Sequence, residues 1–589
     1  MSFYKLQIPE GVSTNDYAPS LSPDIKSQST FQFMRKWYDT CLNSHRYCTR
    51  RQDMKSARDF GLPTRLLDVG PSDSINWRLR ITSEDHLEAI EAGYVTLSHR
   101  WGLSHFIKLT SPDLGKFRQG LPISELPNTF QDAILVTRSL GIRYIWIDSI
   151  CISQDDDKID WVKEAPRMHQ VYGHARFNIV AAHSEGPEGT LFRLRDPSLA
   201  ESIVAESLED EIQIIWDRDT TYEDFNQAPL MERGWVFQER LLAPRMLHFG
   251  KNQVYWRCKG LFAGEGFPFG AQVTDEPDSD SDGMAMDGVV TTALIGIATD
   301  TLDSLLYGFV GEDVWADEWT RFVEDYSRCA LTFAADKLVA LSGIANLVCE
   351  TRSFEYLAGL WKTENLAQQL CWSRSEDHAA PQSVMDGRSH TYRAPSWSWA
   401  SINEPIKHYG ILQHFEKPII KVSEATVVSK GASMTADVEA GHIKLRGYLL
   451  PYFKHNDKKV DVRWTDDWDR SCFEIRFDRE DTTGHSDASN SNSWILPIIC
   501  RQVKHRGERV YHGQGILLQK MADSTTKPAA GVAQISSCRR RGHVMFRCNG
   551  ESWKDVLGFG AEFDHGSEEV IGFVDDQGNR AKFEEITII

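Results

Sequence analysis

The sequence lacks an excess of basic residues. Its 589 residues contain 65 Lys and Arg against 84 Asp and Glu, so the formal net charge is 65 − 84 = −19. Proteins that bind nucleic acids or anionic membranes generally present a basic surface to the phosphates. The composition therefore argues against nucleic acid and membrane partners, although it does not exclude a local basic pocket.

The cysteine patterns of disulfide frameworks and compact zinc sites are also missing. The 11 cysteines are odd in number and include no CxxC pair. No apolar run approaches the about 18 residues that a membrane-spanning helix needs, and the first residues lack the basic and then apolar order of a secretory signal. We therefore expect reduced thiols and a cytoplasmic location.

The sequence is rich in material for packing. Apolar residues make up 41% of the chain and aromatic residues 11%, including 18 Trp, which excludes a disordered protein. At roughly 100 to 200 residues per domain, the length predicts about three domains. The expected regions are a flexible arm (1–30), an N-terminal helical extension (31–90), an α/β domain (91–262), an acidic loop (263–290), a helical region (291–400) and a β-rich C-terminal region (401–589).

The α/β region shows a regular alternation. Apolar runs predict strands at 94–98, 144–148 and 177–182, and apolar residues at helical spacing predict helices between them. Asn128 or Thr129 is expected to cap the first helix, and Asp160 the second. Because the strands are apolar throughout, the pattern predicts a parallel sheet flanked by helices.

Ligands of open parallel sheets bind beyond the carboxyl ends of the strands. The polar residues that follow the three predicted strands are Ser98, His99, Arg100 and Trp101, then Asp148, then His183. Arg100 would suit a phosphate or carboxylate, Trp101 a stacked ring, and Asp148 the hydroxyl groups of a ligand. The alternative is structural: Trp101 belongs to the core, and Arg100 pairs with Asp148.

Several sequence blocks in this region resemble the HET domain of fungal heterokaryon incompatibility proteins. They are Tyr-Val-Thr-Leu-Ser-His-Arg-Trp-Gly (94–102), Leu-Pro-Asn-Thr-Phe-Gln-Asp-Ala-Ile (126–134), Tyr-Ile-Trp-Ile-Asp-Ser-Ile-Cys-Ile-Ser-Gln-Asp-Asp (144–156), Asp-Trp-Val-Lys-Glu (160–164) and Arg-Gly-Trp-Val-Phe-Gln-Glu-Arg-Leu-Leu (233–242). The resemblance identifies 91–262 as a HET domain. It implies nonself recognition and regulated cell death, and a TIR-like fold.

Some TIR domains hydrolyse NAD, and the resemblance therefore implies NAD, or a related nucleotide, as a substrate. The catalytic glutamate of TIR enzymes lies in a Trp-Cys-x-x-Glu segment after the third strand. Trp235 and Glu239 reproduce that spacing, with Val236 in place of the cysteine, and fall on one helical face. Glu239 is the predicted catalytic residue, and Glu164 is its rival. The structural alternative for both is a carboxylate near a helix start, beside Arg233 or Arg240.

The chemistry suits a lone carboxylate. Cleavage of the nicotinamide–ribose bond builds an oxocarbenium-like cation, which a nearby negative charge stabilises. Arg100 or Arg233 would hold the pyrophosphate. We expect no metal and no cofactor, with NAD as substrate, and a homo-oligomer when active that orders the loop 153–157. The alternative function is a non-enzymatic, self-associating adaptor that signals cell death.

Two further patterns involve cysteine. Cys151 lies 52 residues after His99, a separation similar to that of the caspase pair, although Cys151 lacks the caspase surroundings. Cys41, His45 and Cys48 offer three zinc ligands from one helical face, with Cys258 as a distant fourth. Because no CxxC pair occurs, packing of a buried helix face is the favoured interpretation of this second pattern.

Overall fold

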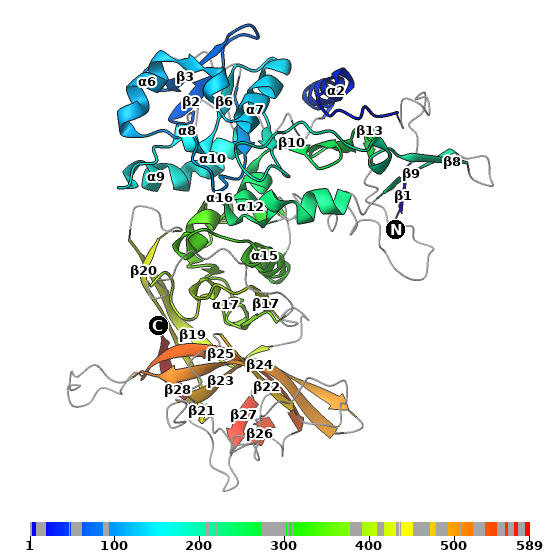
Figure 1. The fold of residues 1–589 in the computed structure, drawn as a ribbon. Helices are drawn as coiled ribbons and strands as arrows, with labels where there is room; N and C mark the ends of the chain where they lie inside the picture. The colour runs from blue at the N-terminus through cyan, green and yellow to red at the C-terminus, as the bar shows by residue number, and fades with distance from the viewer. Residues whose placement is uncertain are drawn as a thin grey trace. The chain divides into compact units, whose positions relative to one another are not determined.

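The computed structural model divides the chain into two compact units, Met1–Asp303 and Ser304–Ile589, each described here by itself (Figure 1). The residues that the structure describes are 3–6, 19–45, 48, 62–85, 93–206, 212–217, 221–271, 302, 305–308, 311–376, 392–408, 417–430, 435, 437–451, 472–478, 493–505, 508–521, 536–549, 560–563, 571–574 and 583–589. Among these residues, no helix combines the length and the apolar composition needed to cross a membrane.

A ten-stranded mixed sheet forms the centre of the first unit. Its strands lie in the order β13-β12-β11-β10-β7-β4-β6-β2-β3-β5. Their bounds are β2 Arg65–Asp68, β3 Asn76–Ile81, β4 Val95–Ser98, β5 Leu121–Pro122, β6 Tyr144–Trp146, β7 Asn178–Val180, β10 Arg245–Phe249, β11 Val254–Cys258, β12 Leu261–Gly264 and β13 Phe267–Ala271.

The four central strands β10, β7, β4 and β6 are parallel, and their register pairs Thr96 of β4 with Asn178 of β7 and with Trp146 of β6. Every residue of these strands is buried, which explains why they are apolar on both faces. In chain order, the parallel strands lie second, first, third, fourth across the sheet. This order reverses direction beside β4, the position where open α/β sheets bind ligands.

Helices connect the parallel strands as predicted. Helix α7 (Asn128–Ser139) leads from β4 to β6, α9 (Ile159–Glu164) and α10 (Met168–Gly173) lead from β6 to β7, and α12 (Gly234–Leu242) precedes β10. The predicted βαβαβ order is therefore confirmed.

The sheet is not parallel throughout, which corrects the predicted parallel sheet. Strands β2, β3 and β5 add antiparallel strands beyond β6, and β11 to β13 add an antiparallel meander beyond β10. The expected helical extension 31–90 thus contains two strands of this sheet. The meander lacks the apolar and polar alternation that marks a strand, because β11 and β12 are buried on both faces.

The second predicted helix, which Asp160 was expected to cap, is interrupted. Pro166 lies in a 3₁₀ turn, Ala165–Arg167, that separates α9 from α10, because proline has no N–H for an α-helical hydrogen bond. Asp160 does not cap the helix and instead forms an ion pair with Arg65, with 2.9 Å between Nη1 and Oδ2. Helix α7 also starts without a side-chain cap, directly after Pro127.

The prediction of a flexible arm at 1–30 is wrong for its two ends. Strand β1 (Phe3–Leu6) pairs with β9 (Ile212–Asp217), which pairs with β8 (Ile203–Glu206) in a separate three-stranded sheet. Helix α2 (Gln28–Ser44) begins inside the expected arm, because the Ser27 hydroxyl accepts a hydrogen bond from the Thr30 N–H at 3.2 Å and caps it.

The second unit contains helices followed by strands, as predicted. Helices α15 (Glu312–Ser327), α16 (Ser342–Arg352) and α17 (Leu366–Gln369) accompany a cluster of buried Trp rings. A nine-stranded sheet follows, in which the long strands β23 (Ser493–His505), β24 (Glu508–Lys520) and β25 (Ser536–Asn549) are drawn in orange in Figure 1. Its other strands are β18 Lys417–Pro418, β19 Lys421–Ser429, β20 Val438–Tyr448, β21 Leu450–Pro451, β22 Cys472–Phe477 and β28 Phe583–Ile588.

The acidic part of the predicted loop, 272–290, lies outside the described residues.

Candidate functional site

Glu239 lies on α12 and points into the core at the carboxyl end of β4. Its side chain accepts a short hydrogen bond from the hydroxyl of Ser98, the last residue of β4, and another from the hydroxyl of Tyr172 on α10. Only 5% of Glu239 is exposed. The glutamate predicted from the resemblance is therefore a buried group with specific partners, which a surface carboxylate near a helix start would not have.

A chain of buried hydrogen bonds fixes the orientation of the Ser98 hydroxyl. The side-chain amide of Asn178 donates from Nδ2 to Ser98 Oγ at 2.8 Å. Its side-chain oxygen, Oδ1, accepts a hydrogen bond from Thr96 Oγ1 at 3.0 Å. Since Ser98 accepts from Asn178, its single proton is available for Glu239. The network joins two neighbouring parallel strands to α12, so the sheet register itself positions Glu239.

The electrostatic surroundings bring the Glu239 carboxyl close to neutrality. Burial raises its pKa to about 7, while the Ser98 hydrogen bond and the positive charge of Arg233 act in the opposite direction, and nearby Asp148 adds to the rise. Burial also raises the pKa of Tyr172 well above its ordinary value. A carboxyl that changes charge near pH 7 at a ligand-binding edge of a sheet is typical of catalytic sites.

Asp148, at the start of α8 (Asp148–Cys151), has different partners from those considered in the sequence. Trp101 Nε1 donates to Asp148 Oδ2 at 2.9 Å, and Nδ1 of His99 lies 3.7 Å from Oδ1. Among the described residues, no hydrogen bond or ion pair joins Arg100 to Asp148, which corrects the structural alternative for this pair. Burial lowers the pKa of His99 to about 4, so its imidazole is neutral at physiological pH.

Arg233 connects a positive charge to this network. Its guanidinium donates a short hydrogen bond to the backbone carbonyl of His99, and its charge lowers the pKa of Glu239. Arg233 is half-buried, as is Trp235, whose ring packs edge-on against Trp161 with 5.9 Å between centroids. Trp235 and Glu239 thus both face the α9–α10 segment.

Two other predicted residues lie outside this network. Nε2 of His183 is 2.9 Å from Asp224 Oδ1, so this imidazole pairs with a different carboxylate. The rival Glu164 accepts a hydrogen bond from Thr64 Oγ1 at 2.6 Å and lies 3.6 Å from the Arg167 guanidinium. Its contacts are those of a structural ion pair.

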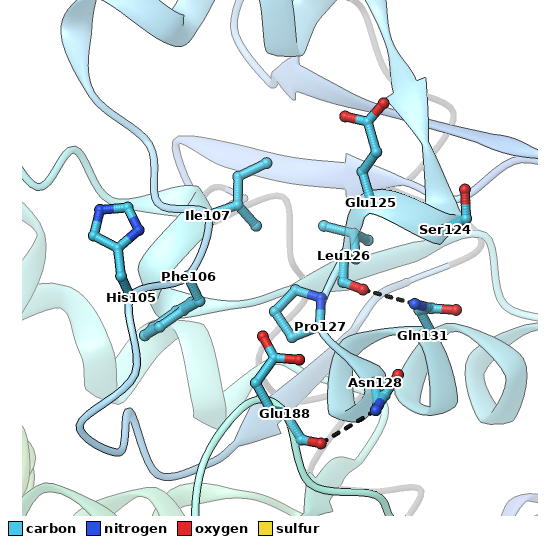
Figure 2. Close-up of a pocket in the computed structure, with 10 residues that line it drawn as sticks. All are labelled: His105, Phe106, Ile107, Ser124, Glu125, Leu126, Pro127, Asn128, Gln131 and Glu188. Atoms are coloured by element: carbon cyan, nitrogen blue, oxygen red, sulfur yellow. Dashed lines mark hydrogen bonds between the residues drawn. The ribbon is translucent and has the colours of Figure 1, made fainter.

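A cavity of about 420 Å³ opens at the same edge of the sheet, between the loop that follows β4 and the first turn of α7 (Figure 2). Asn128, whose amide donates to the Glu188 carbonyl oxygen at 3.2 Å, lies on its wall, with the carboxylates of Glu125 and Glu188. None of the predicted site residues lines it. Phe106, which does line it, packs edge-on against His99, with 6.4 Å between the ring centroids.

The two cysteine patterns have different outcomes. Burial raises the pKa of the Cys151 thiol to about 12, which argues against a cysteine nucleophile. Cys41, His45, Cys48 and Cys258 come together, with their potential ligand atoms all within 4.8 Å of one another.

Sequence reasoning missed the buried polar residues around Glu239. Tyr172 is a direct partner of Glu239, and Thr96 and Asn178, which stand in apolar strands, orient its other partner, Ser98. A buried polar side chain needs a partner. The polar residue within the run Phe177-Asn178-Ile179-Val180 was therefore the signal that could have identified Asn178.

Comparison with known proteins supports the sequence resemblance. The model of the family described as Heterokaryon incompatibility protein (HET) matches residues 94–239. The match covers about a quarter of the 589 residues. The matched region extends from Tyr94 to Glu239 and so contains both Ser98 and Glu239. No curated protein and no solved structure matched the chain.

Proposed function

We propose that this HET-domain protein triggers regulated cell death after nonself recognition in fungi by hydrolysing NAD to nicotinamide and ADP-ribose. The observation that carries the proposal is the Glu239 carboxyl, buried at the end of a parallel strand, hydrogen-bonded to Ser98 and with its pKa raised to about 7. Such a group is expected at a catalytic site and is expensive to maintain elsewhere.

The strand order supports a TIR-like interpretation of the domain. The parallel strands run second, first, third, fourth, and α12 follows the third of them, where TIR enzymes carry their glutamate. The four-residue spacing from Trp235 to Glu239 agrees with the TIR segment, and Val236 departs from it. The half-buried Trp235 and the buried Glu239, which lie on one helical face, would then both contact the nucleotide.

In the proposed step, the bond between ribose C1′ and the nicotinamide nitrogen breaks, and neutral nicotinamide leaves with the bonding electron pair. Water adds its oxygen to C1′ and releases one proton. The ionised Glu239 stabilises the positive charge that develops on the ribose. Ser98 and Arg233 favour this ionised form, because both lower the pKa of Glu239.

The burial of Glu239 implies that the described conformation is a resting one. A substrate reaches Glu239 only if the surrounding segments move. The loop 153–157 is held by Asp155, which accepts hydrogen bonds from the Ser111 N–H at 3.0 Å and from the Ser153 hydroxyl at 2.6 Å. We propose that self-association rearranges this loop and orders it in the conformation of the active enzyme.

The second candidate function is a non-enzymatic adaptor for cell death. Two observations favour it: Glu239 is only 5% exposed, and the neighbouring cavity carries the carboxylates of Glu125 and Glu188, which would repel a pyrophosphate. In an adaptor, the same polar network would only hold the sheet and α12 together.

Expression in a fungal host distinguishes these functions. Wild type, Glu239→Gln and Glu164→Gln are compared for cell death and for intracellular NAD at equal protein level. The enzyme predicts NAD loss before death in wild type and Glu164→Gln, and neither effect in Glu239→Gln. Death without NAD loss, unchanged in Glu239→Gln, would establish the adaptor.

A further inference from the structure

We propose that Cys41, His45, Cys48 and Cys258 bind one structural zinc ion. Three sulfur atoms and one imidazole nitrogen lie within 4.8 Å of one another. Cys₃His is one of the ligand sets of structural zinc sites in proteins. The site is separate from Glu239 and its hydrogen-bond partners, and it does not depend on any NAD chemistry.

The separations fit a tetrahedral ion. With Zn–S bonds of about 2.3 Å, tetrahedral geometry sets the sulfur atoms about 3.8 Å apart. The His45 Nδ1 and Cys258 Sγ atoms are already 3.3 Å apart, and the largest separation in the cluster is at most 4.8 Å. The potential ligand atoms therefore lie at most about 1 Å farther apart than a tetrahedral zinc ion would hold its sulfur ligands.

Local structure explains how the N-terminal segment supplies three ligands. Cys41 and His45 are one helical turn apart, at the end of α2. The helix ends at Ser44, and the Cys48 N–H donates to the His45 carbonyl oxygen at 3.0 Å, which keeps Cys48 close to the end of the helix.

The fourth ligand comes from the sheet. Cys258 is the last residue of β11, immediately before the turn to β12. Gly260 in that turn gives the imidazole room: a Cβ at this position would lie 2.8 Å from Cγ of His45. Because Cys258 is more than 200 residues from Cys48 along the chain, no local sequence spacing could indicate the complete set.

The surroundings are suited to thiolates. Three thiolates and Zn²⁺ together carry one negative charge, and the buried guanidinium of Arg245 donates from Nε to Cys41 Sγ at 3.0 Å. The Gly260 N–H donates to the sulfur of Cys48. Hydrogen bonds of this kind orient metal ligands and tune their charge. Apolar packing of a helix face, the interpretation favoured by the sequence, requires neither contact.

The proposed ion would fasten α2 to the β11–β12 turn of the ten-stranded sheet. Helix α2 already packs against β11, where the Tyr38 ring lies edge-on to Trp256 at 6.2 Å. A bond that joins segments so distant in sequence restricts the unfolded chain strongly. Its expected effect is therefore on stability, with an apo protein that is easier to unfold.

The test uses the full chain, purified under reducing conditions without chelator. Elemental analysis should find about one zinc per chain. Replacement by cobalt should give the intense ligand-field and sulfur-to-metal bands of a tetrahedral thiolate site. Cys41→Ala and Cys258→Ala should each lose the metal, whereas Cys151→Ala, a buried cysteine of the same unit, should retain it as the matched control.

Chelation provides a second measurement that needs no variant. Removal of the metal should lower the melting temperature of the wild-type chain, and added zinc should restore it. The proposal is overturned if the wild type neither retains zinc nor takes up cobalt with tetrahedral bands. It is also overturned if Cys258→Ala binds metal as the wild type does, or if mass spectrometry of the unreduced protein finds disulfides among these three cysteines in place of metal.

Discussion

Replacement of Glu239 by Gln should change how the stability of the protein depends on pH. Burial raises the pKa of Glu239 to about 7 in the folded protein, against an ordinary value of 4.5. The folded state therefore holds this proton more tightly than the unfolded chain. Its contribution to the free energy of unfolding is fully present below pH 4.5 and is lost as the pH rises through about 7.

The size of the effect follows from the two pKa values. The difference between about 7 and 4.5, at about 1.4 kcal/mol per pKa unit, amounts to about 3 kcal/mol over the whole range. Between pH 6 and pH 8, the same linkage gives about 1 kcal/mol. Gln has no proton to lose. The free energy of unfolding of the variant should therefore rise by about this much relative to that of the wild type when the pH is raised from 6 to 8.

Urea unfolding of wild type and Glu239→Gln at pH 6 and pH 8 measures this difference. The comparison of the two proteins removes the contributions of all other titrating groups. Glu164→Gln is the control. Its free energy of unfolding should still decline between pH 6 and pH 8 by the amount that Glu239 causes. Equal pH dependence in wild type and Glu239→Gln would refute the reasoning, because it would mean that the carboxyl titrates alike in the folded and unfolded states.

Three further predictions concern activity. Arg233→Gln removes the charge that lowers the pKa of Glu239, so the pH profile of NAD hydrolysis should move to higher pH; an unchanged profile would exclude Arg233 from the site. Cys151→Ala should hydrolyse NAD and kill cells as wild type does, since burial keeps this thiol protonated, and loss of both would revive the cysteine mechanism. Activity per molecule should rise with protein concentration if self-association orders the loop 153–157 for catalysis, and a flat dependence measured by nicotinamide release would contradict this.

The sequence predicted the parallel core because buried strands between amphipathic helices leave a clear pattern. The family resemblance and the spacing from Trp235 selected Glu239, whose catalytic role stays a prediction. The sequence did not predict the antiparallel strands β11 to β13, because strands buried on both faces resemble other apolar segments. Nor did it show that Glu239 is buried, since its partner Ser98 lies 141 residues away and is brought close only by the sheet.

Contacts between distant segments account for the other differences. Asp160 follows an acidic loop and has the position of a helix cap, yet Arg65 of β2 binds it through two hydrogen bonds of 2.9 and 3.0 Å. Asp160 thus binds a charged side chain instead of the backbone N–H groups at the helix start. The helix cap that is given up is worth about 1 kcal/mol. In the same way, the Cys41, His45 and Cys48 pattern acquires a fourth potential ligand only when β11 brings Cys258 to it.

The most direct test of the account is the incubation of purified protein with NAD, followed by measurement of free nicotinamide, over a range of protein concentrations. Wild type and Glu164→Gln should release nicotinamide, and Glu239→Gln should be on the order of 100- to 1000-fold slower, as is usual when one preorganised electrostatic contact is lost. Release by Glu239→Gln at the wild-type rate, or no release by wild type at any concentration, would contradict it.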